Sequence, residues 1–235
     1  MTLIELVTQL RYILDDTGGH GVDFVTASDS QLKWTNAELV AYINEAQKEV
    51  VRRTKSIFDS TTPEVCEIEI LTGIDEYTLH DSILKITRAK LASATKNIRI
   101  VSYKDMDSLN SNWESVPAGT IEYLIDDWST NKIKLHRTPA ADDVLNLRVC
   151  RLPLCNMVWA RRETDKPEIS EQMHLAMLHW AAHIAYFKDE PNTLDPQAAE
   201  RHDIKFTKEF GPKTDFYSQE RRKKTKRSVS YGGIR

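Results

Sequence analysis

The sequence has few cysteines, and none of them form a redox or metal-binding pair. The three cysteines, Cys66, Cys150 and Cys155, are odd in number and contain no CxxC spacing. The odd number argues against a disulfide scaffold, and the missing CxxC spacing argues against a cysteine zinc site. A reducing compartment therefore fits the chain best, and we expect no cofactor and no metal ion.

Long uninterrupted apolar segments are also missing. Glu5 stands where a signal peptide would have its apolar core, and the most apolar later stretch, residues 175–187, is interrupted by His179 and His183. A membrane-spanning helix needs about 20 consecutive, predominantly apolar residues. The sequence therefore predicts a soluble protein that is made inside the cell and has no membrane partner.

The common enzyme signatures are absent as well. The chain contains no GxSxG, no phosphate-binding loop and no GxGxxG. Adjacent aspartates occur at 15–16, 126–127 and 142–143, and a glycosidase needs two carboxyl groups across a cleft. Each pair lies beside a turn signal, where aspartate is favoured because it hydrogen-bonds to the local backbone. Turn formation is the preferred interpretation, and we do not expect an enzyme.

Two histidines could in principle bind a metal ion. His179 and His183 are four residues apart in a predicted helix, so both rings lie on one face. No glutamate follows His179 as it does in HExxH, and no third ligand is evident. A structural or subunit-interface role is therefore preferred for both residues.

The strongest local pattern predicts one long amphipathic helix from Trp34 to Phe58. Thr35 and Glu38 have the spacing of a capping box, and Trp34 and Leu39 have that of a hydrophobic staple. Apolar residues recur at helical spacing along one stripe, so the helix needs a packing partner along its length. The charged residues that we expect to face water are Glu38, Glu45, Lys48, Glu49, Arg52 and Lys55.

Three more helices and several strands are predicted around this helix. The helices begin at Thr2, at Ser170 and at Asp195-Pro196, and Gly211 ends the last one. Period-two alternation in the middle of the chain indicates short strands, with a short helix at 106–113. The strand candidates are residues 65–71, 76–79, 84–91, 98–101, 121–126, 132–137 and 145–152.

This order of elements predicts an α+β fold. The N- and C-terminal helices have no sheet of their own, so we expect them to form one bundle that carries an inserted antiparallel β domain. The expected segments are bundle helices at 1–60, the β insertion at 61–158, bundle helices at 159–211 and a basic tail at 212–235. We expect the tail to stay flexible until a partner orders it.

Charge is distributed unevenly along the chain. Residues 211–235 have eight basic and two acidic side chains, a net charge of +6, so the other 210 residues carry -9 of the total of -3. The tail could be a phosphate-binding arm, a docking strand for an acidic partner or a solvated segment without a specific role. Its densest basic run and the aromatic residue that follows comprise Arg221, Arg222, Lys223, Lys224, Lys226, Arg227 and Tyr231.

Four segments resemble the adaptor, or head-to-tail connector, proteins of tailed bacteriophages, especially short-tailed ones. They are WTNAELVAYINEAQKEVVRRT, EYTLHDSILKITRAKL, IKLHRTPAADDVLNLRVCRLPL and PEISEQMHLAMLHWAAHIAYFKDEPNTLDPQAAERHDIKFTKEFG. The resemblance covers nearly the whole chain, from Thr2 to about Gly211. It implies a structural protein of the virion neck, made in the host bacterial cytoplasm.

The resemblance also implies specific partners. Proteins of this family form a ring, expected to be of twelve copies, beneath the portal protein, and they grip the portal with a C-terminal extension. That would make Arg221 to Tyr231 a portal-docking tail. The opposite side of the ring would hold the tail nozzle or tube protein, and genomic DNA would pass through the lumen without sequence-specific binding. Candidate contacts with the neighbouring subunit are Glu45, Lys48, Glu49, Arg52, His179 and His183.

The sequence also allows two other functions. One is a carboxylate-based peptidoglycan hydrolase, because at least one adaptor-like protein is thought to cleave cell-wall glycan. The other is a DNA-binding module acting through Arg221 to Arg227, which would have an affinity that falls steeply with salt. A body of net charge -9 repels a polyanion, which favours the adaptor over the DNA-binding module.

Overall fold

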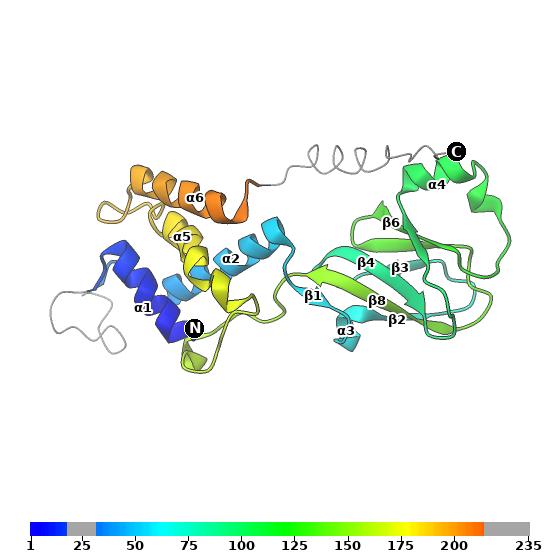
Figure 1. Cartoon of the computed structure of the whole chain (residues 1–235), viewed down its shortest axis with the longest axis horizontal. Helices are drawn as coiled ribbons and strands as arrows, with labels where there is room; N and C mark the ends of the chain where they lie inside the picture. The colour runs from blue at the N-terminus through cyan, green and yellow to red at the C-terminus, as the bar shows by residue number, and fades with distance from the viewer. Residues whose placement is uncertain (18–31, 214–235) are drawn as a thin grey trace, which may run out of the picture. The chain divides into compact units, whose positions relative to one another are not determined.

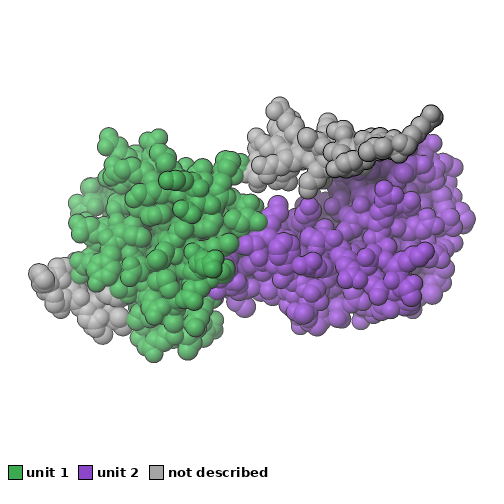
Figure 2. Space-filling model, viewed as in Figure 1, with its two compact units in different colours: residues 1–54, 157–166, 170–235 green, residues 55–156, 167–169 purple. Residues whose placement is uncertain are grey.

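The computed structural model describes residues 1–17 and 32–213 and has the predicted α+β class (Figure 1). The chain divides into two compact units (Figure 2). Unit 1 contains residues 1–54, 157–166 and those from 170 onward, whereas unit 2 contains residues 55–156 and 167–169. Unit 2 is therefore inserted in the sequence of unit 1.

In the part of unit 1 that the structure describes, the chain forms four α-helices. They are α1 (Leu3–Leu14), α2 (Asn36–Thr54), α5 (His174–Ala185) and α6 (Pro196–Phe210). Helix α5 packs against each of the other three, because apolar residues surround most of its axis, including the buried Met177, Leu178, Ala181 and Ala182. The short turns η3 (Trp159–Arg161) and η4 (Glu171–Met173) precede α5.

The predicted helix starts are confirmed at three of the four helices. Capping boxes form at Thr2 with Glu5 and at Thr35 with Glu38, where each backbone N–H of the threonine donates to the glutamate over 2.8 Å. The carboxylate of Asp195 accepts from the N–H of Ala198 over 2.9 Å at the start of α6. At the fourth, Ser170 begins η4 instead, and its side chain makes no capping bond.

Helix α2 is shorter than predicted. It ends at Thr54 instead of continuing to Phe58, because Lys55 has a φ of 54° and leaves the helical conformation. The chain then forms β1 (Phe58–Asp59), and α3 (Pro63–Cys66) occupies the first residues of the predicted strand at 65–71.

Unit 2 contains two four-stranded sheets. In the first, β8 (Asp143–Arg151) pairs antiparallel with β1, with β2 (Glu67–Ile70) and with β4 (Ile83–Leu91). The order in the second is β3 (Glu76–Thr78), β7 (Lys132–His136), β6 (Tyr123–Ser129) and β5 (Arg99–Val101). One apolar core joins both sheets, since it includes Val149 and Leu147 of the first and Leu124 and Ile133 of the second.

The prediction of a purely antiparallel β region is wrong at one pair. Strand β5 runs parallel to β6. A parallel pair requires a crossover between its strands, and residues 102–122 supply one that includes α4 (Tyr103–Leu109) and the turn η2 (Trp113–Ser115). The short helix predicted at 106–113 therefore belongs to this crossover.

Candidate functional site

The candidate site residues fall into two groups. The basic tail residues Arg221 to Arg227, together with Tyr231, lie outside the described residues. The candidate subunit contacts are described, and they lie on α2 and α5 of unit 1.

The exposed charges of α2 are paired with one another. The guanidinium of Arg52 lies 2.6 Å from Glu45 Oε1 and 3.5 Å from Glu49 Oε2, and Lys48 Nζ lies 4.0 Å from Glu45 Oε2. The side chains of Glu45 and Arg52 are 43% and 44% exposed. Exposed pairs of this kind contribute about 0–1 kcal/mol to stability. Glu45, Lys48 and Arg52 can therefore replace these ion pairs with ion pairs to another protein surface at little cost in folding stability.

Glu49 corrects the sequence-based expectation, because it is buried and not on the water-exposed face. Its residue exposure is only 7%, and Arg53 Nε donates to its Oε1 over 2.8 Å. Helix α6 covers this side of α2, since Arg53 also contacts Thr207. A buried carboxylate is retained when it has a cationic partner, and Glu49 has Arg53 and Arg52.

Arg53 is the central residue of this region, and the sequence analysis did not single it out. Its side chain is 3% exposed, and its terminal nitrogen donates to Thr207 Oγ1 over 3.0 Å and to the Gly211 carbonyl over 2.8 Å. The guanidinium also lies 4.7 Å from the ring centre of Phe206 and 5.0 Å from that of Trp180. The one signal in the sequence was the spacing of four from Glu49.

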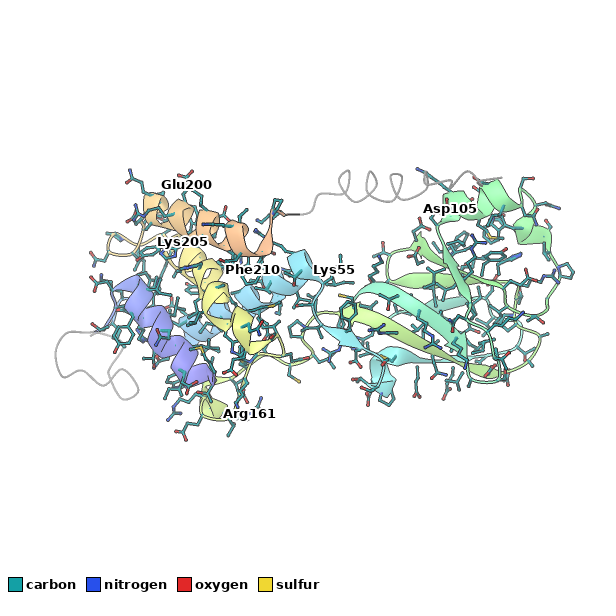
Figure 3. The ribbon with its side chains drawn as sticks, viewed as in Figure 1. Lys55, Asp105, Arg161, Glu200, Lys205 and Phe210 are labelled. Atoms are coloured by element: carbon teal, nitrogen blue, oxygen red, sulfur yellow. The ribbon has the colours of Figure 1, made fainter. Side chains whose placement is uncertain are left out.

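These contacts hold the start of the C-terminal extension. We call residues 211–213 the root of the extension, since they follow Phe210, which Figure 3 marks at the end of α6. Besides the Gly211 carbonyl bonded to Arg53, Lys213 Nζ lies 4.9 Å from the Trp180 ring centre. The root is thus attached to side chains from α2 and α5.

His179 and His183 make contacts within their own unit. His179 Nδ1 lies 3.1 Å from His202 Nδ1, and His183 Nδ1 lies 2.9 Å from the Ala199 carbonyl oxygen that accepts its proton. Both contacts join α5 to α6. Across residues 1–17 and 32–213, no group of three or more His, Cys, Asp or Glu side chains is arranged to hold a metal ion.

The histidine pair is electrically neutral near pH 7. Burial, together with the repulsion that a protonated His179 would exert, lowers the pKa of His202 to about 4. Burial and the charge of Lys205 also lower the pKa of His179. One Nδ1 of the pair therefore donates and the other accepts. His202 was not identified from the sequence because its partner lies 23 residues earlier.

A surface groove lies beside this histidine pair. It has a volume of about 300 Å³ and is lined by Leu175, Ala176, His179, Lys205, Lys208 and Glu209. Leu175 at its edge is 56% exposed, and Lys205 is marked on α6 in Figure 3. The groove therefore presents an apolar side chain between charged ones, which suits a protein contact.

The adjacent aspartates bind backbone N–H groups, but these groups lie far away in the sequence, so the prediction of hydrogen bonds within the local turns is wrong for Asp16, Asp127 and Asp142. Asp16 accepts from the backbone N–H of Lys33 and pairs with the buried Arg11. Asp127 accepts from the N–H of Tyr103, and Asp142 accepts from that of Thr72. These carboxylates thus connect separate segments of the chain through backbone N–H groups, which gives them a structural role.

The described residues define an α+β protein that has a paired charge network on the surface of α2 and a root, residues 211–213, held by side chains of α2 and α5. The sequence matches the family model of the SU10 adaptor protein over residues 1–230. The chain therefore belongs to the SU10 adaptor protein family, a family of phage head-to-tail adaptors, and the resemblance seen in the sequence is confirmed. No curated protein matches the chain.

Family membership makes the chain a structural protein of the phage neck, associated with portal and tail components. None of the helices in the described ranges, 1–17 and 32–213, combines the length and the apolarity that a membrane span requires. The family is structural, which agrees with the expectation that the protein is not an enzyme.

Proposed function

We propose that this adaptor forms a ring, expected to be of twelve copies, that joins the portal to the tail and surrounds the passage for genomic DNA. The observation that carries the proposal is the root of the extension, which is held against α2 and α5 by Arg53 and Trp180. An extension held at its origin can present its basic run at a defined place, as a docking arm must. The net charge of +6 over residues 211–235 suits an acidic surface on the portal.

Contacts between neighbouring subunits are proposed at the exposed charges of α2 and beside the groove of unit 1. Glu45, Lys48 and Arg52 are exposed or half-buried and bound only weakly to one another. His179 and His183 line or adjoin the α5–α6 surface that carries the exposed Leu175. A closed ring needs two different, complementary patches on each copy, and these two surfaces supply both charged and apolar area.

Passage of DNA is consistent with the charge of the body. The 210 residues before the extension carry a net charge of -9. Since phosphate contacts from lysine and arginine dominate DNA affinity, an acidic lumen would let DNA slide without tight or sequence-specific binding. The tail nozzle or tube protein is the partner proposed for the side of the ring away from the portal.

Electron microscopy of the purified protein mixed with its portal protein tests this function. We expect a ring stacked on the portal. Deletion of residues 215–235 should weaken that assembly by tenfold or more in apparent Kd while the thermal unfolding of unit 1 stays unchanged, because the deleted residues follow α6 and its contacts with α5. Titration by light scattering measures the apparent Kd, and circular dichroism measures the thermal unfolding.

A matched control separates docking from bulk charge. A chain in which residues 221–227 are shuffled with their composition kept has the same net charge as the wild type. Equal assembly of the shuffled chain would indicate charge attraction alone. If no association with the portal occurred at any salt concentration, the adaptor function would be wrong; salt-sensitive binding to DNA without binding to the portal would favour the DNA-binding module.

A further inference from the structure

We propose that Arg53 is the positioning residue of the C-terminal extension, and that it sets the direction in which the extension leaves unit 1 toward the portal. The inference rests on the proposed docking function and adds the residue through which that function depends on α2. The side chain of Arg53 is buried, at 3% exposure, so the role proposed for it is an indirect one.

The first step is the geometry at Gly211. Its N–H donates to the Thr207 carbonyl over 2.9 Å, which closes the last turn of α6. Its own carbonyl accepts from Arg53 over 2.8 Å. The φ of Gly211 is 82°, a conformation that glycine adopts without strain. Since both polar backbone groups of Gly211 are bound, the chain direction beyond α6 is fixed at this residue.

The second step is the aromatic support of the root. The Arg53 guanidinium lies over the rings of Phe206 and Trp180, and Lys213 Nζ lies over Trp180 as well. Cations within about 6 Å of a ring centre are attracted to its face. The root is therefore held at two positions, once through the Gly211 backbone and once through the Lys213 side chain.

The third step concerns the chemistry of residue 53. The planar guanidinium donates to Glu49 through Nε and to Thr207 and Gly211 through a terminal nitrogen. A lysine could keep the ion pair with Glu49. Its single ammonium group, on a flexible side chain, cannot make the same set of hydrogen bonds or stack on the rings as the planar guanidinium does. The position thus requires arginine for its geometry and not only for its charge.

A root that is already held in place reduces the entropy cost of docking. A segment that is free at its origin loses more conformational entropy on docking than one whose origin is already placed. Holding the root should therefore raise the affinity of the extension for the portal without any direct contact from Arg53.

Hydrogen exchange of the free protein tests the anchor without the portal. Arg53→Met should speed exchange of the Gly211 amide by about tenfold or more, because a charge-assisted hydrogen bond and the ring contacts are lost. Arg53→Lys, which keeps the charge next to Glu49, should give a smaller increase and covers the case in which the methionine variant folds poorly. The control is Arg52→Met, which removes the adjacent exposed arginine and should leave Gly211 unchanged. Unchanged exchange in both Arg53 variants would overturn the proposal.

A double-mutant comparison with the portal tests the link to docking. Arg53→Lys should weaken portal binding about three- to tenfold in the full chain. In the chain that lacks residues 215–235, the same substitution should have no further effect on portal binding. A general structural role would weaken binding equally in both backgrounds and would contradict the proposal.

The two experiments can fail separately. If deletion of residues 215–235 leaves portal binding intact while Arg53→Lys still speeds exchange at Gly211, the docking function is wrong and the anchor alone stands. If the deletion weakens binding but Arg53→Lys changes neither exchange nor affinity, docking stands and the positioning role is refuted.

Discussion

His202 illustrates how a single side chain makes a helix contact depend on pH. It lies on α6, stacks on Tyr186 at 5.7 Å between ring centres and shares a proton with His179 of α5. Protonation of either ring places a charge in a buried contact that needs one neutral acceptor. The charged groups Arg201, Lys205 and Glu209 and the titratable His183 face this pair.

Unit 1 should lose stability as the pH falls through the range from about 6.5 to about 4. The pKa of His202 is about 4 in the folded protein and near 6.5 in the unfolded chain, so the unfolded state binds the proton first. The contribution of neutral His202 to the stability of unit 1 is fully present above about pH 6.5 and is lost as the pH falls to about 4. Between pH 7 and pH 5, urea unfolding of the wild type should show about 2 kcal/mol more loss than that of His202→Gln. Equal losses in both proteins would show that His202 does not carry the effect.

Single residues also show what the sequence could reveal. Thr35, Glu38 and Asp195 were predicted correctly because a cap depends on residues three positions away. Arg53 and Gly211 are 158 positions apart, and no local spacing indicates that contact. The burial of Glu49 was not predicted for the same reason. Helical periodicity predicts on which side of α2 the Glu49 side chain lies, but it cannot predict that α6 packs against that side.

At the scale of elements, the end of α2 is the clearest difference from prediction. The apolar stripe continues to Ile57, so periodicity predicts a longer helix. The helix nevertheless stops where Lys55 takes a left-handed conformation, a position at which glycine is the usual residue. The predicted strands are largely correct in position, but their pairing could not be predicted. Alternation of apolar and polar residues shows which side chains face the core, but it does not show which strands lie next to each other in a sheet.

Lys55→Gly should stabilise the protein by about 0.5–1 kcal/mol, since glycine adopts a φ near 54° without the steric cost that lysine has there. Urea unfolding measures the change. Lys55→Ala is the matched control: it removes the same side chain but keeps the backbone strain, so it should give no gain. A stability gain from alanine equal to that from glycine would argue against strain as the cause.

At the scale of the whole molecule, Arg151 holds together three separate parts of unit 2. Its Nε donates to Asp59 over 2.6 Å, and a terminal nitrogen donates to Glu168 over 2.7 Å. Burial opposes the ionisation of Asp59, but bonds from the Thr61 N–H and from Arg151 outweigh it and hold the pKa of Asp59 well below its usual range. Residues 59, 151 and 168 lie near the points in the sequence where the chain passes between the units.

Arg151→Met should lower the unfolding free energy of unit 2 by about 3–5 kcal/mol, because it leaves the carboxylate of Asp59 buried without its cation. Hydrogen exchange at β8 amides should report the loss, while exchange in α5 stays at the wild-type level. Arg148→Met is the control, since this exposed arginine on the same strand stacks on Phe58 and pairs with no carboxylate in the described ranges. A similar loss in both variants would show that the ion pairs are not responsible.

The central place of β8 determines when each unit can form during synthesis. Strands β1, β2 and β4 all pair with β8, which begins at residue 143, so the ribosome completes more than half of the chain before the first sheet can close. Helices α1 and α2 wait longer, because α5, against which both pack, begins at residue 174. The nascent protein thus carries unpaired strands and open helix faces through most of its translation. Unit 1 therefore completes its packing after the first sheet of unit 2, although α1 and α2 are made before the strands.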